Sequence, residues 1–89
     1  MINVYFTSAF IKKIKRIANK DKRLFKLIWE CVERFKNKNN HYSLRVHKLH
    51  GDFKRLHSFS INYDFRIVFE YLSDDEVLFH DIGNHSIYR

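Results

Sequence analysis

The 89 residues are expected to form one domain, residues 1–89, because so short a chain builds a single hydrophobic core. Apolar residues make up 45% of it and aromatic residues 17%, which excludes intrinsic disorder. The net charge of +7 indicates either an anionic partner or a solvated, lysine-rich helix face. No apolar run reaches a membrane span, no secretion signal opens the chain, and the one cysteine, Cys31, suits a reducing cytoplasm.

The first half of the chain predicts a strand and two helices. Residues 2–7 alternate apolar and polar side chains, which is typical of a half-buried strand. Thr7 or Ser8 can cap the helix that follows, and Asp21 can cap a second helix. The strongest signal in the sequence is the apolar stripe of this second helix, at helical spacing: Leu24, Leu27, Ile28, Cys31, Val32 and Phe35.

The second half predicts three β-strands. Turn-forming residues at 37–43 end the second helix, and β-rich runs follow at 56–62, 65–72 and 76–82. The connections between these runs are short enough for hairpins, and the run 65–72 is so apolar that we expect it at the centre of the sheet. The expected fold is α+β with the order β-α-α-β-β-β: a helical hairpin packed on a mainly antiparallel four-stranded sheet.

Three motifs stand in order in the second half. "KLHG" (48–51) precedes a predicted strand, "YDFRIVFE" (63–70) contains the central one, and "DIGNHSIYR" (81–89) follows the last. Together they resemble the RelE/ParE toxin superfamily of type II toxin–antitoxin modules, and the ending resembles its RelE/StbE or YafQ-like branch. The length and the order of elements fit that RelE-like fold over the whole chain.

This resemblance implies an endoribonuclease without metal or cofactor that cleaves mRNA on the ribosome and so inhibits translation. Cleavage by the 2′-hydroxyl of the RNA needs a base, a cation to offset charge on the phosphorane, and an acid for the leaving oxygen. Histidine suits the proton steps because its pKa lies near neutrality. Arginine suits the phosphate because its planar group donates two fixed hydrogen bonds.

The resemblance also implies roles for individual residues. Arg66 is expected to bind the phosphate and stabilise the transition state, and His47 and His85 are the expected acid and base, in an order left open. Asp64 either orients a histidine or caps a turn. RNA or phosphate binding is expected of further residues, for which packing or solvation is the alternative: Lys48, Lys54, Arg55, Ser60, Phe65, Tyr88 and Arg89.

Two positions depart from the pattern of the superfamily. Strand alternation directs Phe59 into the core and therefore Ser58 and Ser60 toward the expected site. Relatives often carry a basic residue or histidine where Ser60 stands, and some carry arginine where Asp81 stands. Either the two histidines share the proton steps, or the activity is weak.

Three alternatives remain open. A ParE-like toxin binds DNA gyrase and cleaves nothing, although the terminal "GNHSIY" motif argues against that group. A second alternative is a catalytically inactive relative that only binds. A structural zinc site is disfavoured because the six histidines form no close pair with thiols.

The charge is distributed unevenly, which bears on partners. Residues 1–55 hold 15 Lys and Arg against 4 Asp and Glu, whereas residues 56–89 hold 2 against 6. Such toxins are made beside an antitoxin, so we expect an acidic, amphipathic antitoxin segment to bind the basic half, which includes Lys12, Lys13 and Arg16, in a hetero-oligomer. The ribosome and its mRNA are the other expected partners, and no membrane is expected.

Overall fold

The structure is a computed structural model that describes residues 1–51 and 55–84. The expectations for Lys54, His85, Tyr88 and Arg89 therefore lie outside the described residues. The elements are, in chain order, β1 (Asn3–Phe6), α1 (Ser8–Lys20), α2 (Lys22–Phe35), the 3₁₀ turn η1 (Lys38–Asn40), β2 (His47–Lys48), β3 (His57–Ser60), β4 (Arg66–Ser73) and β5 (Glu76–Gly83).

The strands form one sheet in the order β1-β5-β4-β3-β2. Among the strands that the structure describes, β1 and β5 pair in parallel, and the other neighbouring pairs are antiparallel. The predicted α+β fold class is confirmed, and β4 is central as expected. Over residues 1–51 and 55–84 the sheet has five strands rather than the four predicted, because the two residues of β2 pair with the start of β3. A strand of two residues leaves no alternation that could reveal it in the sequence.

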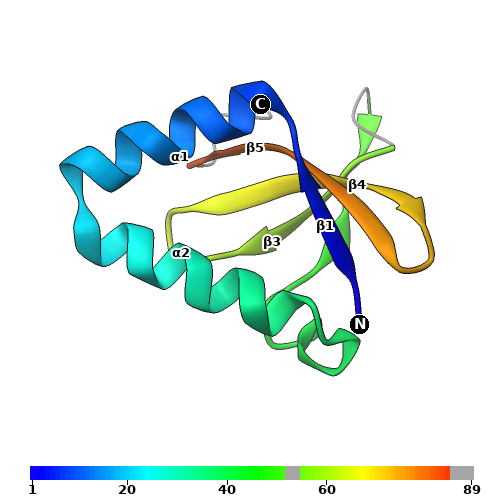
Figure 1. Ribbon diagram of the computed structural model, residues 1–89. Coiled ribbons are helices and arrows are strands. Elements are labelled where there is room, and N and C mark those ends of the chain that lie inside the picture. Colours follow the sequence, from blue (N-terminus) through cyan, green and yellow to red (C-terminus); the bar gives the residue numbers. More distant parts are fainter. Residues whose placement is uncertain (52–54, 85–89) are drawn as a thin grey trace.

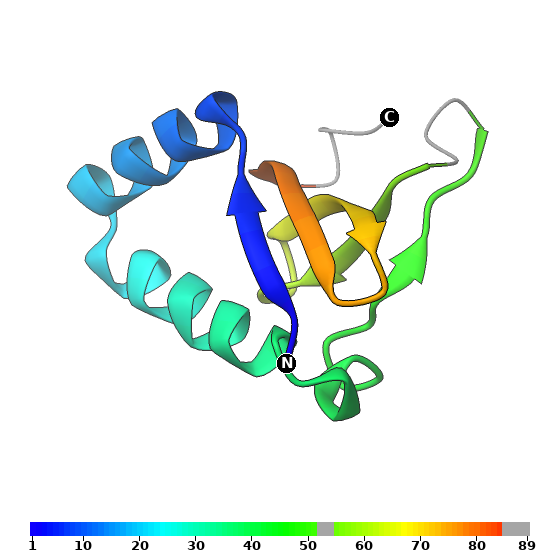
Figure 2. The same ribbon diagram turned by 45° about the vertical axis from the view of Figure 1, so that its right-hand side comes forward.

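Both helices lie against the same face of the sheet (Figures 1 and 2). Each begins at the predicted cap: the Thr7 hydroxyl accepts from the Phe10 amide at 3.1 Å, and the Asp21 carboxylate accepts from the Leu24 amide at 3.0 Å. The apolar faces of helices and sheet meet in one cluster: Ile2, Phe10, Ile14, Ile28, Cys31, Val32, Phe35, Leu44, Phe59, Ile61, Ile67, Phe69, Val77, Phe79 and Ile82. No helix in the described part of the chain is long and apolar enough to cross a membrane.

The register of β3 and β4 decides which side chains point away from the helices. Phe59 pairs with Ile67 in the core, so the flanking pairs, Ser60 with Arg66 and Ser58 with Val68, point to the opposite face. Here we call this the open face of the sheet. It carries the polar side chains on which a functional site can be built.

Candidate functional site

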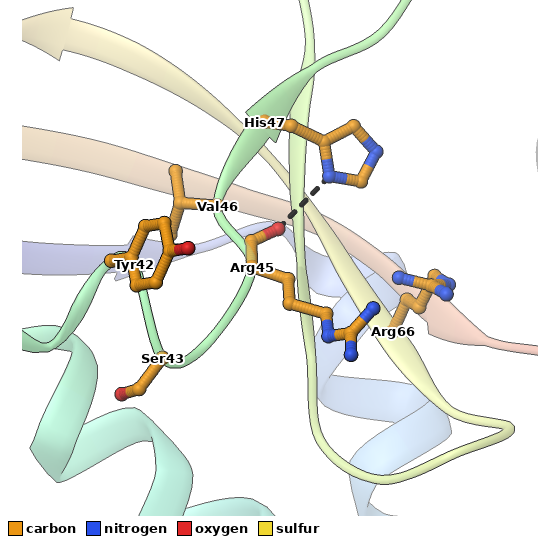
Figure 3. Close-up of a pocket in the computed structure, with 6 residues that line it drawn as sticks. All are labelled: Tyr42, Ser43, Arg45, Val46, His47 and Arg66. Atoms are coloured by element: carbon orange, nitrogen blue, oxygen red, sulfur yellow. Dashed lines mark hydrogen bonds between the residues drawn. The ribbon is translucent and has the colours of Figure 1, made fainter.

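A pocket of about 650 Å³ opens beside this face of the sheet. It brings together two of the residues expected from the sequence, His47 and Arg66, which are separated by 19 positions in the chain. Its volume lies in the range of small-ligand sites. Figure 3 shows the residues that line it: Tyr42, Ser43, Arg45, Val46, His47 and Arg66.

His47, the first residue of β2, is held in a defined orientation. Its Nδ1 lies 2.9 Å from the backbone oxygen of Arg45, as the dashed line in Figure 3 marks. Because a carbonyl oxygen can only accept, Nδ1 carries the proton and donates, and Nε2 of the neutral ring keeps its lone pair. Nε2 also lies 3.4 Å from the Ser58 hydroxyl, a long contact. The exposed His47 ring therefore presents a basic nitrogen on the open face.

Arg66 begins β4 and lies opposite Ser60 on β3. Its Nη1 donates to the Ser60 hydroxyl at 2.9 Å, so Ser60 holds the guanidinium from one side. On the other side, β5 places Gly83 directly across from Arg66. The end of the last strand thus lies beside the start of the central one.

Asp64 and Phe65 lie in the β3–β4 connection. The side chain of Asn62 caps this turn by accepting from both their backbone amides, at 2.9 and 2.8 Å. The exposed Asp64 carboxylate makes no hydrogen bond or ion pair with another described residue, and Phe65 packs against the hydrophobic core. These positions favour a packing role for Phe65.

Lys48 lies on the other face of the sheet from His47, because it pairs with His57 and cross-strand partners share a face. His57 packs against Phe69 and Tyr71, with ring centroids 5.6 and 5.0 Å apart. Desolvation by this burial lowers the pKa of His57 from its ordinary value of 6.5, and the charges of Lys48 and His47 lower it further. Arg55 is exposed and does not line the pocket.

Asp81 is engaged with a helix. Its carboxylate forms an ion pair with Lys13 of α1 at 2.7 Å, and the same ammonium lies 3.4 Å from the backbone oxygen of Ile82. The acidic residue that departs from the family pattern therefore ties α1 to β5.

Four residues of the pocket were not expected from the sequence: Tyr42, Ser43, Arg45 and Val46. The Tyr42 side chain is 96% exposed, and Arg45 has a left-handed backbone with φ of 58°. Tyr42 and Ser43 belong to the run of turn formers at 37–43, and Arg45 and Val46 follow it closely. That pattern does not show which way a loop side chain points.

The described residues include no group of three or more His, Cys, Asp or Glu side chains that could hold a metal ion. The pocket instead offers guanidinium groups, an imidazole and hydroxyls. This set of side chains can bind a phosphate and exchange a proton with it.

No family model matches the chain, and no curated protein matches it in sequence. Solved structures do match. YoeB of Staphylococcus aureus in its complex with YefM has a TM-score of 0.75 and 19% identity over 96% of this chain and 98% of that chain. YafQ of Escherichia coli has a TM-score of 0.69 and 16% identity over 99% of this chain and 98% of that chain. A copper-bound mutant toxin of Helicobacter pylori has a TM-score of 0.71 and 24% identity over 97% of each chain.

These neighbours, and a YoeB/ParE toxin of Agrobacterium tumefaciens, are toxins of the RelE/ParE superfamily. Their coverage extends over almost the whole of both chains, so the match concerns the complete arrangement of helices and sheet. The chain has the fold of the RelE/ParE-superfamily toxins, as its sequence motifs predicted.

Proposed function

We propose that this protein is the toxin of a type II toxin–antitoxin module and a metal-independent endoribonuclease that cleaves mRNA on the ribosome. The observation that carries the proposal is the His47–Arg66 pair in one pocket, with Nδ1 of His47 held by the Arg45 carbonyl and Nε2 left basic. The shared fold of YoeB and YafQ supports it.

The chemistry proceeds through the RNA's own hydroxyl. Nε2 of His47 takes the proton of a 2′-hydroxyl while the 2′-oxygen attacks the adjacent phosphorus. Arg66, fixed by Ser60, donates to the non-bridging oxygens as negative charge builds on the phosphorane. The 5′-oxygen leaves with a proton from an acid, and the products are a 2′,3′-cyclic phosphate and a free 5′-hydroxyl.

His85 is the proposed acid. It is the second residue after Gly83, which the sheet places across from Arg66. Tyr88 and Arg89 would then contact the RNA beyond the reacting phosphate. A site on one face of a sheet leaves one side of the RNA uncovered, and in this proposal the ribosome provides the opposite wall.

An antitoxin is the second proposed partner. S. aureus YoeB is described in a heterotetrameric toxin–antitoxin complex with YefM. In this chain an apolar groove of about 300 Å³ lies among Phe6, Phe10, Ile14, Phe25 and Trp29, and the exposed Lys15 of α1 is part of its lining. An acidic segment with apolar anchors matches both features.

Incubating the protein with programmed ribosomes and mapping 5′ ends in the mRNA tests the proposed activity. We expect cleavage by the wild type and a loss of about 10²- to 10⁴-fold in Arg66→Ala and in His85→Ala, the range for losing a charged or proton-transferring group. Arg23→Gln, which removes a charge from an exposed position on α2, is the matched control and should cleave normally.

A wild type that leaves ribosome-bound mRNA intact would contradict the enzymatic proposal. Inhibition of DNA gyrase by that same preparation would then identify a ParE-like toxin. Antitoxin binding without either effect would identify an inactive relative.

A further inference from the structure

Arg45 occupies a backbone position that normally belongs to glycine. Two hydrogen bonds close the turn between His41 and Val46. The Arg45 amide donates to the Tyr42 carbonyl oxygen at 3.1 Å, and the Val46 amide donates to the His41 carbonyl oxygen at 3.0 Å. These are the two bonds of a Schellman turn, in which the residue with positive φ is usually glycine or asparagine. Arg45, with φ of 58°, is the one described non-glycine residue with a left-handed backbone.

The turn is anchored by the two residues that precede Arg45. Leu44 is buried in the core, and its carbonyl accepts from the Ser60 amide at 2.8 Å. Arg34 of α2 donates to the Ser43 hydroxyl at 2.9 Å. An arginine is therefore kept where glycine would be less strained, and such strain is found most often at functional sites.

The left-handed turn directs both the backbone carbonyl and the side chain of Arg45 toward the pocket. Its carbonyl accepts from His47, and its side chain runs along the pocket wall toward the guanidinium of Arg66 (Figure 3). Arg45 and Arg66 both line the pocket, so two guanidinium groups open into one space. Guanidinium groups placed together in this way can donate to the oxygens of one phosphate or of two neighbouring phosphates.

We propose that Arg45 is a second phosphate-binding residue of the site, which acts with Arg66 on the backbone of the bound RNA. This inference rests on the proposed function and adds a residue that the sequence motifs do not contain. Glycine at this position would keep the turn and the carbonyl that orients His47, and would remove only the guanidinium. The backbone therefore allows the side chain to be tested separately from the fold.

The experiment compares wild type with Arg45→Gly, Arg45→Asn and Arg45→Lys, with Arg23→Gln as the control for net charge. A 2′-O-methyl single-stranded RNA is the probe, because it binds without being cleaved. We expect the glycine and asparagine variants to bind at least tenfold more weakly, and the logarithmic salt slope to decrease by about 0.7 for one lost phosphate contact. Lysine should restore part of the binding, and Arg23→Gln should bind like the wild type.

Thermal unfolding distinguishes a binding role from a structural one. Arg45→Gly should unfold at or above the wild-type temperature, and above Arg45→Ala, because glycine adopts positive φ without strain. A folded Arg45→Gly protein that binds RNA with wild-type affinity and salt slope would overturn the inference and leave the proposed function intact. A wild type that does not bind the probe would also overturn the inference, whereas the proposed function is tested separately by cleavage on programmed ribosomes.

Discussion

Tyr42 is an exposed aromatic side chain at the edge of the pocket, and its position suggests contact with a base. Its side chain is 96% exposed, and it begins the turn that carries Arg45 and His47. Proteins that bind single-stranded nucleic acid stack bases on such rings, and each stacked base contributes about 1–3 kcal/mol. We expect Tyr42→Ala to weaken RNA binding roughly fivefold to hundredfold in a fluorescence titration.

Tyr63 provides the matched control for Tyr42. It is 92% exposed, lies in the β3–β4 turn and does not line the pocket. Tyr63→Ala should bind RNA like the wild type. Equal losses of RNA affinity from the two substitutions would show that exposed aromatic residues contribute to binding whether or not they line the pocket, and would contradict the role of Tyr42.

The burial of His57 predicts how the free energy of unfolding depends on pH. Its burial against Phe69 and Tyr71 lowers its pKa from 6.5, so the unfolded chain takes up a proton at pH values where the folded protein does not. The free energy of unfolding should therefore fall as the pH decreases below about 6.5, and level off below the folded-state pKa. Denaturant unfolding of the wild type and His57→Phe across this range checks it. The variant should lose this part of the pH dependence, and an unchanged curve would contradict the assignment.

At the scale of elements, Thr7 connects α1 to β5. Its hydroxyl caps α1 and also lies 3.2 Å from the backbone oxygen of His80, to which it donates. We expect Thr7→Ala to lower the free energy of unfolding by about 1–2 kcal/mol, the upper part of the range for a cap. Thr7→Ser keeps the hydroxyl and should lose less. If thermal unfolding shows Thr7→Ser to be as destabilised as Thr7→Ala, the hydrogen bonds of the hydroxyl contribute little to stability.

The elements that the sequence predicts are those with a repeating pattern. The stripe from Leu24 to Phe35 and the caps at Thr7 and Asp21 depend only on neighbours along the chain, and they are found as expected. The strand β2 and the parallel pairing of β1 with β5 depend on contacts between distant segments. A bulge on β5 also breaks the alternation, since Val68 pairs with Asp81 and Phe69 with Phe79.

The residues of the site also fall into those that the sequence predicts and those that it does not. His47 and Arg66 were expected because the first precedes the "KLHG" motif and the second lies within "YDFRIVFE", and the sheet brings them into one pocket. Alternation likewise placed Ser58 and Ser60 toward them, where each contacts one of the two. Arg45 could not be expected, because its role depends on a positive φ that a sequence without glycine at that position does not indicate.

For the whole molecule, the charge imbalance predicts how the proposed antitoxin partner would bind. Lys12, Lys15 and Arg16 are exposed on α1, whereas Lys13 is engaged with Asp81 and is a poor choice for charge reversal. Reversing the first three to glutamate should weaken antitoxin binding and reduce its dependence on salt, because the attraction between exposed charges is screened. Calorimetric titration at low and high salt checks this. Binding that is insensitive to both changes would show that apolar contacts alone hold the complex.

The central claim is that His47 on the open face transfers a proton during RNA cleavage. The most direct test is the single-turnover rate of mRNA cleavage on ribosomes by His47→Ala beside the wild type, with thermal unfolding of both proteins. We expect a rate lower by about 10²- to 10⁴-fold, the range for a general base, in a protein that unfolds like the wild type, since the His47 ring is exposed. A folded His47→Ala protein that cleaves at the wild-type rate would contradict it.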